Sequence, residues 1–173
     1  MTCGFAHRLS RDKSKPLMSK GERISQLVSQ LRGIQVQGKA AVVSDDPYYR
    51  AFFQCWNDQR YYEAHDVLEQ VWLNTETSDD DFFKGLIQGA GAFVHLQKNF
   101  EYPTHPKHSR RLRPAVRLFL LAEEHLSPFA PDRHRLDVAG FLILLREHRE
   151  KIEASDFLVN PWSPATAPKL TQK

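Results

Sequence analysis

The sequence predicts an all-α protein, a compact bundle of five or six antiparallel helices. Apolar residues recur at helical spacing through most of the 173 residues, and no segment shows a convincing strand pattern. Short turns join most of the periodic segments, which favours antiparallel neighbours. A chain of this length can bury a core as one domain.

The chain divides into three parts by composition. Residues 1–18 lack an apolar period and are rich in Lys and Arg, so we expect a disordered basic tail. Residues 19–154 are expected to form a single helical domain. Residues 155–173 hold three prolines and are expected to form an extended tail, from which Phe157 and Trp162 can pack back on the bundle.

The first two helices are predicted from their starts and their apolar faces. Ser19 and Glu22 match a capping box, and apolar residues follow at helical spacing: Ile24, Leu27, Val28, Leu31 and Ile34. Asp46 is expected to cap the second helix, with Pro47 at its first position. This helix carries an aromatic face: Tyr49, Phe52, Phe53 and Trp56.

The remaining helices follow from turn residues and the same periodicity. The third runs from the turn at 57–59 to about Leu73, and Ser78 or Asp79 caps the fourth. Three glycines inside the fourth helix imply close approach of a neighbouring backbone: Gly85, Gly89 and Gly91. Residues 102–108 break the pattern, Pro114 opens a helix that ends at Leu126, and Asp132 is expected to cap the last helix.

Composition excludes several classes of protein. The longest apolar run, 139–145, is far shorter than the roughly 20 residues of a membrane span, so we expect no membrane contact and a cytoplasmic protein. The basic, serine-containing start leaves organelle targeting as the alternative. Cys3 and Cys55 have neither disulfide-framework nor zinc-site spacing. No glycine-rich phosphate loop, nucleophile with a flanking base or dinucleotide fingerprint is present.

A polar cluster is predicted at the seam between the third and fourth helices. His65 lies at the edge of the apolar stripe of its helix, with Glu69 and Tyr62 further round, while Gln88 flanks the stripe of the next helix. If Leu73 is level with Asp80, His65 is level with Gln88. We therefore expect a His65–Gln88 hydrogen bond, with Glu69 paired to Lys84 or to a tyrosine hydroxyl.

A metal ion is the alternative use of this cluster, although no cofactor is predicted. His65 and Glu69 stand at i, i+4, which suits a divalent cation. In the predicted register His95 lies near residues 57–61, roughly 10 Å along the helix axis from His65. Metal ligands must converge within about 2.2 Å of a zinc ion. A third ligand would then come from another helix or from a second subunit.

A second cluster is basic and lies in a stretch without an acid, between Glu101 and Glu123. It consists of Lys107, Arg110, Arg111, Arg113 and Arg117. Such a cluster can hold phosphate or an acidic partner, but the interpretation that we favour is a solvated basic loop and helix start. Nucleic-acid binding is not expected, because aromatic residues that stack on bases are sparse there.

Two segments resemble domain-of-unknown-function family 309, whose members carry an EAHExxExxW helix and a GLIQ helix. The matching parts are Tyr62-Glu63-Ala64-His65, Leu68-Glu69, Trp72 and Gly85-Leu86-Ile87-Gln88, with His95 and Asn99 in the expected places. The resemblance covers residues 49–126 and implies a small all-helical domain without an established activity. Asp66 stands where the family usually has Glu, and residues 101–112 replace a short Gly-Ala link.

Two functions are compatible with these residues. The leading hypothesis is a non-enzymatic helical module, a homodimer that binds a protein partner, with a structural polar network at His65 and Gln88. The alternative is a metal-dependent or acid-base enzyme, hydrolase-like, in which His65 is base or ligand and Glu69 is ligand or orienting group. The candidate ligand or network residues are Tyr62, His65, Asp66, Glu69, Trp72, Gln88 and His95.

Overall fold

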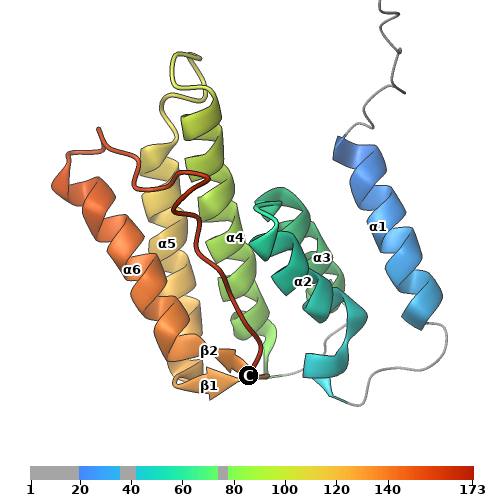
Figure 1. Ribbon diagram of the computed structural model, residues 1–173. Helices are drawn as coiled ribbons and strands as arrows, with labels where there is room; N and C mark the ends of the chain where they lie inside the picture. Colours follow the sequence, from blue (N-terminus) through green and yellow to red (C-terminus); the bar gives the residue numbers. More distant parts are fainter. Residues whose placement is uncertain (1–19, 36–41, 74–77) are drawn as a thin grey trace, which may run out of the picture.

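The protein is an all-α bundle, as the sequence predicts (Figure 1). The computed structural model describes residues 20–35, 42–73 and 78–173, so the expected basic tail at 1–18 lies outside the described residues. The helices are α1 (Lys20–Gln35), α2 (Pro47–Asn57), α3 (Tyr61–Leu73), α4 (Asp80–Glu101), α5 (Leu112–Leu126) and α6 (Val138–Ala154). Single 3₁₀ turns occupy Val43–Asp45 and Ser127–Phe129.

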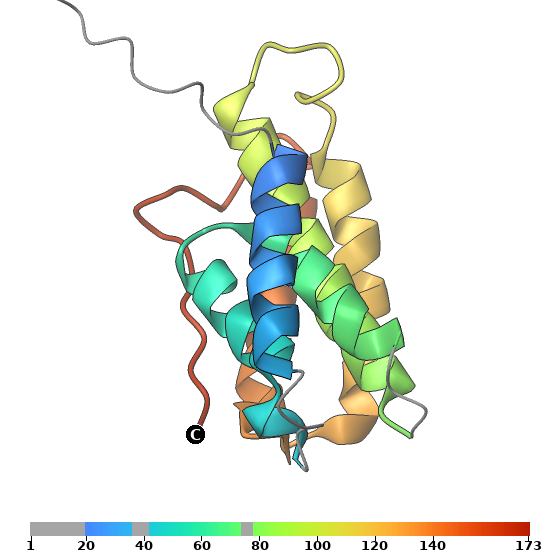
Figure 2. The same ribbon diagram turned by 90° about the vertical axis from the view of Figure 1, so that its right-hand side faces the viewer.

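The longest helix, α4, packs between α3 and α5, and α2 and α6 lie beside these two in turn (Figure 1). The first helix, α1, stands on the outer side of α2 and α3 (Figure 2). The predicted cap of α2 is confirmed, since the Asp46 carboxylate accepts from the N–H groups of Tyr48 and Tyr49 at 2.8 and 3.2 Å. This cap satisfies donors that the first helical turn leaves unpaired.

Aromatic side chains fill the centre of the bundle. The fully buried Trp56 ring lies edge-on to Phe93 and Phe141, with ring centroids 4.8 and 5.4 Å apart. Edge-to-face pairs of this kind add roughly 0.5–1.5 kcal/mol each to the burial of their surface. Close approach of α4 and α5 is confirmed at Gly85, where a Cβ atom would lie 2.5 Å from Leu126 Cγ.

A short β-hairpin precedes α6. It corrects the expectation that the chain has no strand and the expectation that Asp132 caps the last helix. Asp132–Arg133 pairs with Leu136–Asp137, so Asp132 begins a strand and does not cap a helix. The cap of α6 is Asp137, whose carboxylate accepts from Gly140 N at 3.0 Å. His134 and Arg135 form the turn with φ of 48° and 61°. The sequence analysis missed this turn. Residues 136–152 follow a helical period, and neither turn residue is the glycine that usually indicates a positive φ.

The buried carboxylate of Asp79 ties this hairpin to the start of α4. Arg133 Nε and His134 Nε2 lie 2.9 Å from its two oxygens, and Asp79 is only 6% exposed. The His134 ring also stacks on Phe83, with 9° between the planes. A buried carboxylate is tolerated only when such partners surround it, so Asp79 fixes the hairpin and the first turn of α4 together.

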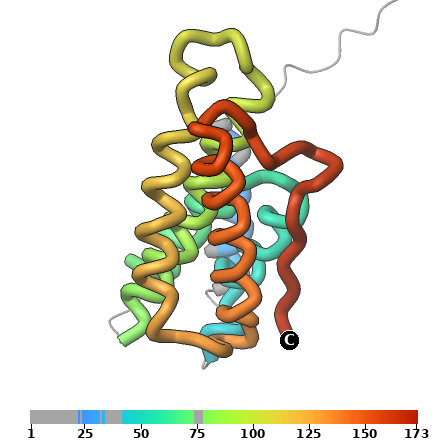
Figure 3. Tube along the Cα trace, turned by 90° about the vertical axis from the view of Figure 1, so that its left-hand side faces the viewer, coloured from blue at the N-terminus to red at the C-terminus, as the bar shows by residue number. Residues whose placement is uncertain are grey.

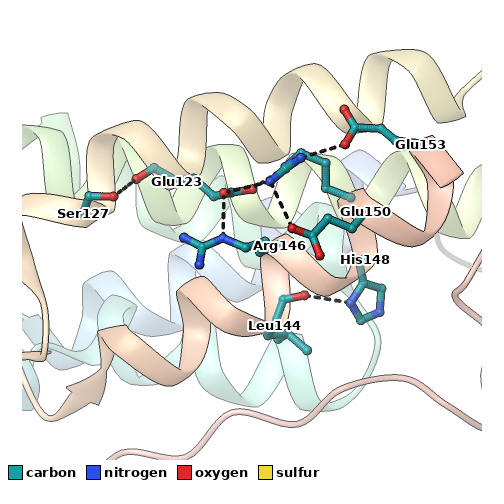
Figure 4. Close-up of polar contacts among 8 residues, drawn as sticks. Glu123, Ser127, Leu144, Arg146, His148, Glu150 and Glu153 are labelled. Atoms are coloured by element: carbon teal, nitrogen blue, oxygen red, sulfur yellow. Dashed lines mark hydrogen bonds and ion pairs between the residues drawn. The ribbon is translucent and has the colours of Figure 1, made fainter.

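Glu123 organises the seam between α5 and α6 (Figure 4). Its carboxylate accepts from Arg149 Nε at 2.8 Å and lies 3.6 Å from Arg146 Nε. Arg149 continues to Glu153 on its own helix at 2.7 Å. The pair is largely shielded from water, and the forked guanidinium suits carboxylates in this geometry. Directional contacts of Glu123 with Arg146 and Arg149, in addition to apolar burial, thus fix how α5 packs against α6.

Residues 155–173 form an extended segment that packs along the bundle (Figure 3). Trp162 is 2% exposed and its indole N–H donates to Tyr61 Oη at 3.1 Å, so the expected return of Trp162 to the bundle is confirmed. Further along, the Trp56 indole N–H donates to the Pro168 carbonyl at 3.0 Å. Within the part of the chain that the structure describes, none of the helices is long and apolar enough to cross a membrane.

Replacement of Trp162 by alanine tests how much the C-terminal segment stabilises the bundle. We expect Trp162→Ala to lower the free energy of unfolding by about 3–5 kcal/mol, because it empties a buried ring site and leaves Tyr61 Oη without its donor. Urea unfolding followed by circular dichroism measures this loss. Leu158→Ala is the matched control, since Leu158 is 83% exposed. Equal stability of the two variants would contradict the role assigned to Trp162.

Candidate functional site

The candidate site lies on the outward side of α3, α4 and α5. On α3, Ala64 and Leu68 are fully buried, whereas the His65 and Glu69 side chains are 31% and 43% exposed. This confirms the predicted position of His65 at the edge of the apolar stripe. Tyr62 is 41% exposed, and its ring is nearly parallel to that of His65, at 14° with centroids 6.4 Å apart.

The register of α3 against α4 differs from the predicted one by three residues. Three contacts define it: Gln59 O accepts from Gln97 Nε2, His65 Cδ2 lies beside Gly91, and Lys84 Nζ lies over the Trp72 ring. His65 is therefore level with Gly91, and Gln88 is displaced from it by about 4.5 Å along the axis. In this register His95 lies level with Tyr61, at the end of the predicted range 57–61, and about 6 Å along the axis from His65.

Contacts at the start of α4 explain this register. The prediction placed Leu73 level with Asp80, as a minimal turn would. In the structure Trp72 Nε1 donates to the Asp80 carboxylate, and Lys84 pairs with Asp80 and with Asp81. The first turn of α4 therefore projects beyond the end of α3, and Lys84 is drawn toward these acids and away from Glu69. The predicted Glu69–Lys84 pair is not formed.

The predicted His65–Gln88 hydrogen bond is also wrong. Gln88 Oε1 lies 2.8 Å from His125 Nδ1 of α5, a partner that the sequence analysis missed. His65 Nδ1 lies 3.1 Å from Asp66 Oδ1 and 3.9 Å from Glu69 Oε1. Because ionised carboxylates only accept hydrogen bonds, this contact places a proton on Nδ1 and leaves the lone pair of neutral His65 on Nε2.

His65, Asp66 and Glu69 are the residues of this site that can hold a metal ion. Their candidate ligand atoms lie within 4.8 Å of one another. The expectation that a third ligand comes from another helix or subunit did not anticipate Asp66, which follows His65 on the same helix. His95 does not join this group.

His95 belongs to a separate cluster with Arg111, at the other end of the α4–α5 seam. Its Nδ1 lies 3.2 Å from Arg111 Nη1, and a guanidinium has no acceptor, so His95 accepts this hydrogen bond. Burial, and after it the positive charges of Arg111 and Arg117, together lower the pKa of His95 to about 4. The stretch without an acid between Glu101 and Glu123 contains Arg111, and it was the sequence feature that could have indicated this partner of His95.

A polar pocket of about 360 Å³ adjoins the site at the junction of α2, α3 and α4. Its lining includes Tyr62 and the buried Glu63, which lies 3.7 Å from Arg60. The other lining residues are Asp58, Gln59, Gln97, Lys98 and Glu101. His65, Asp66, Glu69 and Gln88 do not line it, and Tyr62, which lines the pocket and stacks on His65, connects the pocket with the three-residue group.

The state of His95 makes stability depend on pH. Its pKa is 6.5 in the reference state and about 4 in the fold, so the fold disfavours its protonation. As far as His95 is concerned, the free energy of unfolding is therefore at its full value above pH 6.5. It falls as the pH drops toward 4, by at most about 1.4 kcal/mol per pH unit for one imidazole. Urea unfolding between pH 4 and 8 measures this slope.

His95→Gln, which cannot titrate, is expected to flatten this dependence. The pKa of the buried His148 is lowered too, so part of the slope remains in the variant. Identical slopes for the variant and the wild-type chain would contradict the assignment.

Comparison with known proteins gives one match. Residues 49–101 match the family model described as Domain of unknown function (DUF309). The match spans most of α2, all of α3 and all of α4, and it stops short of the expected Leu126. Comparison with curated proteins found no match, and neither did comparison with solved structures. The resemblance predicted from the motifs is confirmed, since residues 49–101 of this chain are similar to the model of the DUF309 family.

Proposed function

We propose that the protein is a non-enzymatic helical module that pairs with a second copy of itself through the α3–α4–α5 face. The observation that carries this proposal is the openness of the face, where apolar and polar side chains alternate. Tyr62 on α3 and Leu121 on α5 are each 41% exposed. Aromatic and aliphatic side chains of this kind form the anchors of protein interfaces.

Gly91 lies in the middle of the face and has no side chain, which suits contact with a helix of another molecule. A Cβ atom on Gly91 would lie 3.3 Å from Leu118 Cδ1 and 3.8 Å from His65 Cδ2. The α4 backbone is therefore bordered by side chains of α3 on one side and of α5 on the other. A small residue between larger neighbours lets a partner side chain approach the backbone closely.

Charge complementarity favours a second copy as the occupant. The α3 side of the face carries Asp66 and Glu69, and the α5 side carries the exposed Arg117. Among the described residues, no carboxylate lies within ion-pair distance of Arg117. A two-fold dimer uses the same face twice. With the two-fold axis parallel to α4, α3 of one subunit lies on α5 of the other, and the acids face the arginine.

Charge exchange tests this dimer. Arg117→Glu and Glu69→Lys are each expected to raise the dimer dissociation constant at least about tenfold, because like charges then face each other. The combined Arg117→Glu, Glu69→Lys chain restores the attraction and therefore the dimer. Sedimentation velocity over a concentration series measures all three.

Lys151→Glu is the control for this test, because the exposed Lys151 lies on α6, away from the face. The proposal fails if the wild-type chain is monomeric at high micromolar concentration. It also fails if the double variant is no better associated than the single ones.

A metal-dependent, hydrolase-like function is the second candidate, favoured by the grouping of His65, Asp66 and Glu69. Imidazole nitrogen and carboxylate oxygen together suit zinc or manganese. Three protein ligands leave coordination positions for water, whose pKa a bound zinc lowers to about 7.

Metal content separates this second candidate from the first. If it holds, protein purified without an affinity tag contains stoichiometric metal, and titration with Zn²⁺ or Mn²⁺ shows one site. His65→Ala then abolishes binding while circular dichroism shows an intact fold. His125→Ala, which removes an imidazole from the same face but outside the group, retains the site. Absence of binding to the wild-type chain rules out this candidate.

A further inference from the structure

We propose that the α4–α5 seam holds a binding site for a phosphate monoester, formed by Arg111 with His95 and His108. The site is separate from the α3 group of His65, Asp66 and Glu69. The proposal does not depend on self-association of the chain.

Arg111 is the centre of the site because its charge has no anionic partner. Its Nη1 lies 3.2 Å from His95 Nδ1 and its Nε lies 2.8 Å from His108 Nδ1, so two imidazoles accept its hydrogen bonds. Within the described part of the chain, no carboxylate lies within ion-pair distance of Arg111. A half-buried guanidinium held only by neutral acceptors is an unbalanced charge that an anion would stabilise.

The cluster retains hydrogen-bond donors for such an anion. A neutral imidazole that accepts at Nδ1 carries its proton on Nε2, so His95 and His108 each keep one N–H. Arg111 has five N–H donors, and the two contacts above use only part of them. A forked guanidinium together with imidazole N–H groups matches the several oxygens of a phosphate group.

Contacts from α4 and the C-terminal segment hold the loop that carries His108. Asn99 Nδ2 donates to Ser109 O at 3.0 Å and to His108 O at 3.4 Å. Asn99 Oδ1 in turn accepts from Asn160 Nδ2 at 3.0 Å. The His105 ring packs against His108 with centroids 4.4 Å apart. The loop that carries His108 is thus held before any ligand binds, which lowers the entropic cost of binding.

The surroundings reinforce a positive potential. The segment between Glu101 and Glu123 contains five Lys or Arg residues and no acid. The first turn of α5 also lacks an acidic residue, so the positive end of its dipole is not neutralised. The pKa of His108 is lowered, first by desolvation and then by Arg111, which fits a field that repels further protons.

A phosphate monoester fits better than a nucleic-acid strand. Single-stranded nucleic acid needs a groove with aromatic side chains on which successive bases stack. Near the cluster, Tyr102 already has ring partners, since Lys98 Nζ lies 5.1 Å from its ring centroid and the His108 ring centroid lies at 5.4 Å. One compact charged group with two or more acceptor oxygens needs no such platform.

Isothermal titration of the full chain with phenyl phosphate, at pH 7 and low salt, tests the proposal. We expect one site, and Arg111→Gln is expected to weaken binding at least about tenfold. Arg113→Gln is the matched control: it removes the same charge two residues further along the chain, but Arg113 lies 3.9 Å from Asp156 and over the Phe157 ring. The control is expected to weaken binding less than threefold.

A second readout keeps the test independent of the stability of Arg111→Gln. In wild-type protein, ¹⁵N NMR of the imidazoles is expected to show phenyl phosphate raising the pKa of His95. The charged groups that face His95 are Arg111 and Arg117 from α5, and an added dianion offsets both. Arg111→Lys keeps the charge but loses the fork, and weaker binding by this variant supports the assigned geometry.

Several results would overturn the proposal. They are absence of phenyl phosphate binding, equal weakening by the Arg111 and Arg113 variants, or equally tight binding of phenylacetate. Retention of a single-stranded RNA by the chain without any binding of phenyl phosphate would assign the cluster to a nucleic-acid backbone instead.

Discussion

The buried carboxylate of Asp79 is the constraint on which the rest of the structure depends. It joins the start of α4 to the hairpin before α6 through Arg133 and His134, and so fixes where the longest helix begins. Because α4 packs against both α3 and α5, its position along its axis decides which side chains meet at both seams. The ion cluster of Asp79, together with the contacts of Trp72 and Lys84 to Asp80, therefore holds the N-terminal end of the helix on which the candidate site is built.

Local patterns predicted the fold class, and tertiary contacts decided the rest. Helical periodicity and the Asp46 cap located α2 and the edge position of His65 correctly, because both depend on residues within one or two turns. The partners of Gln88 and His95 could not be found in the same way. His125 lies on α5 and Arg111 caps its start, and the three-residue displacement of α4 accompanies side-chain contacts of Trp72 and Lys84 with Asp80 that helical periodicity does not reveal.

The polar residues of the family motifs form separate small groups on one face. His65 pairs with Asp66, Gln88 with His125, and each contact satisfies one hydrogen-bonding atom. A closed catalytic constellation needs several groups converging on one point from which water is excluded. These groups instead lie side by side on partly exposed helices. This arrangement suits recognition across a surface. The α3 group of His65, Asp66 and Glu69 also offers ligand atoms for a cation.

The C-terminal segment also affects how the protein is made. The bond between Trp56 and Pro168 spans 112 residues, and it closes over the aromatic centre of the bundle. At a synthesis rate of about 5–20 residues per second, Trp56 is synthesised roughly 6–22 seconds before its acceptor Pro168. During that interval the aromatic side chains of α2 and α3 lack the contacts that the C-terminal segment makes with Trp56 and Tyr61.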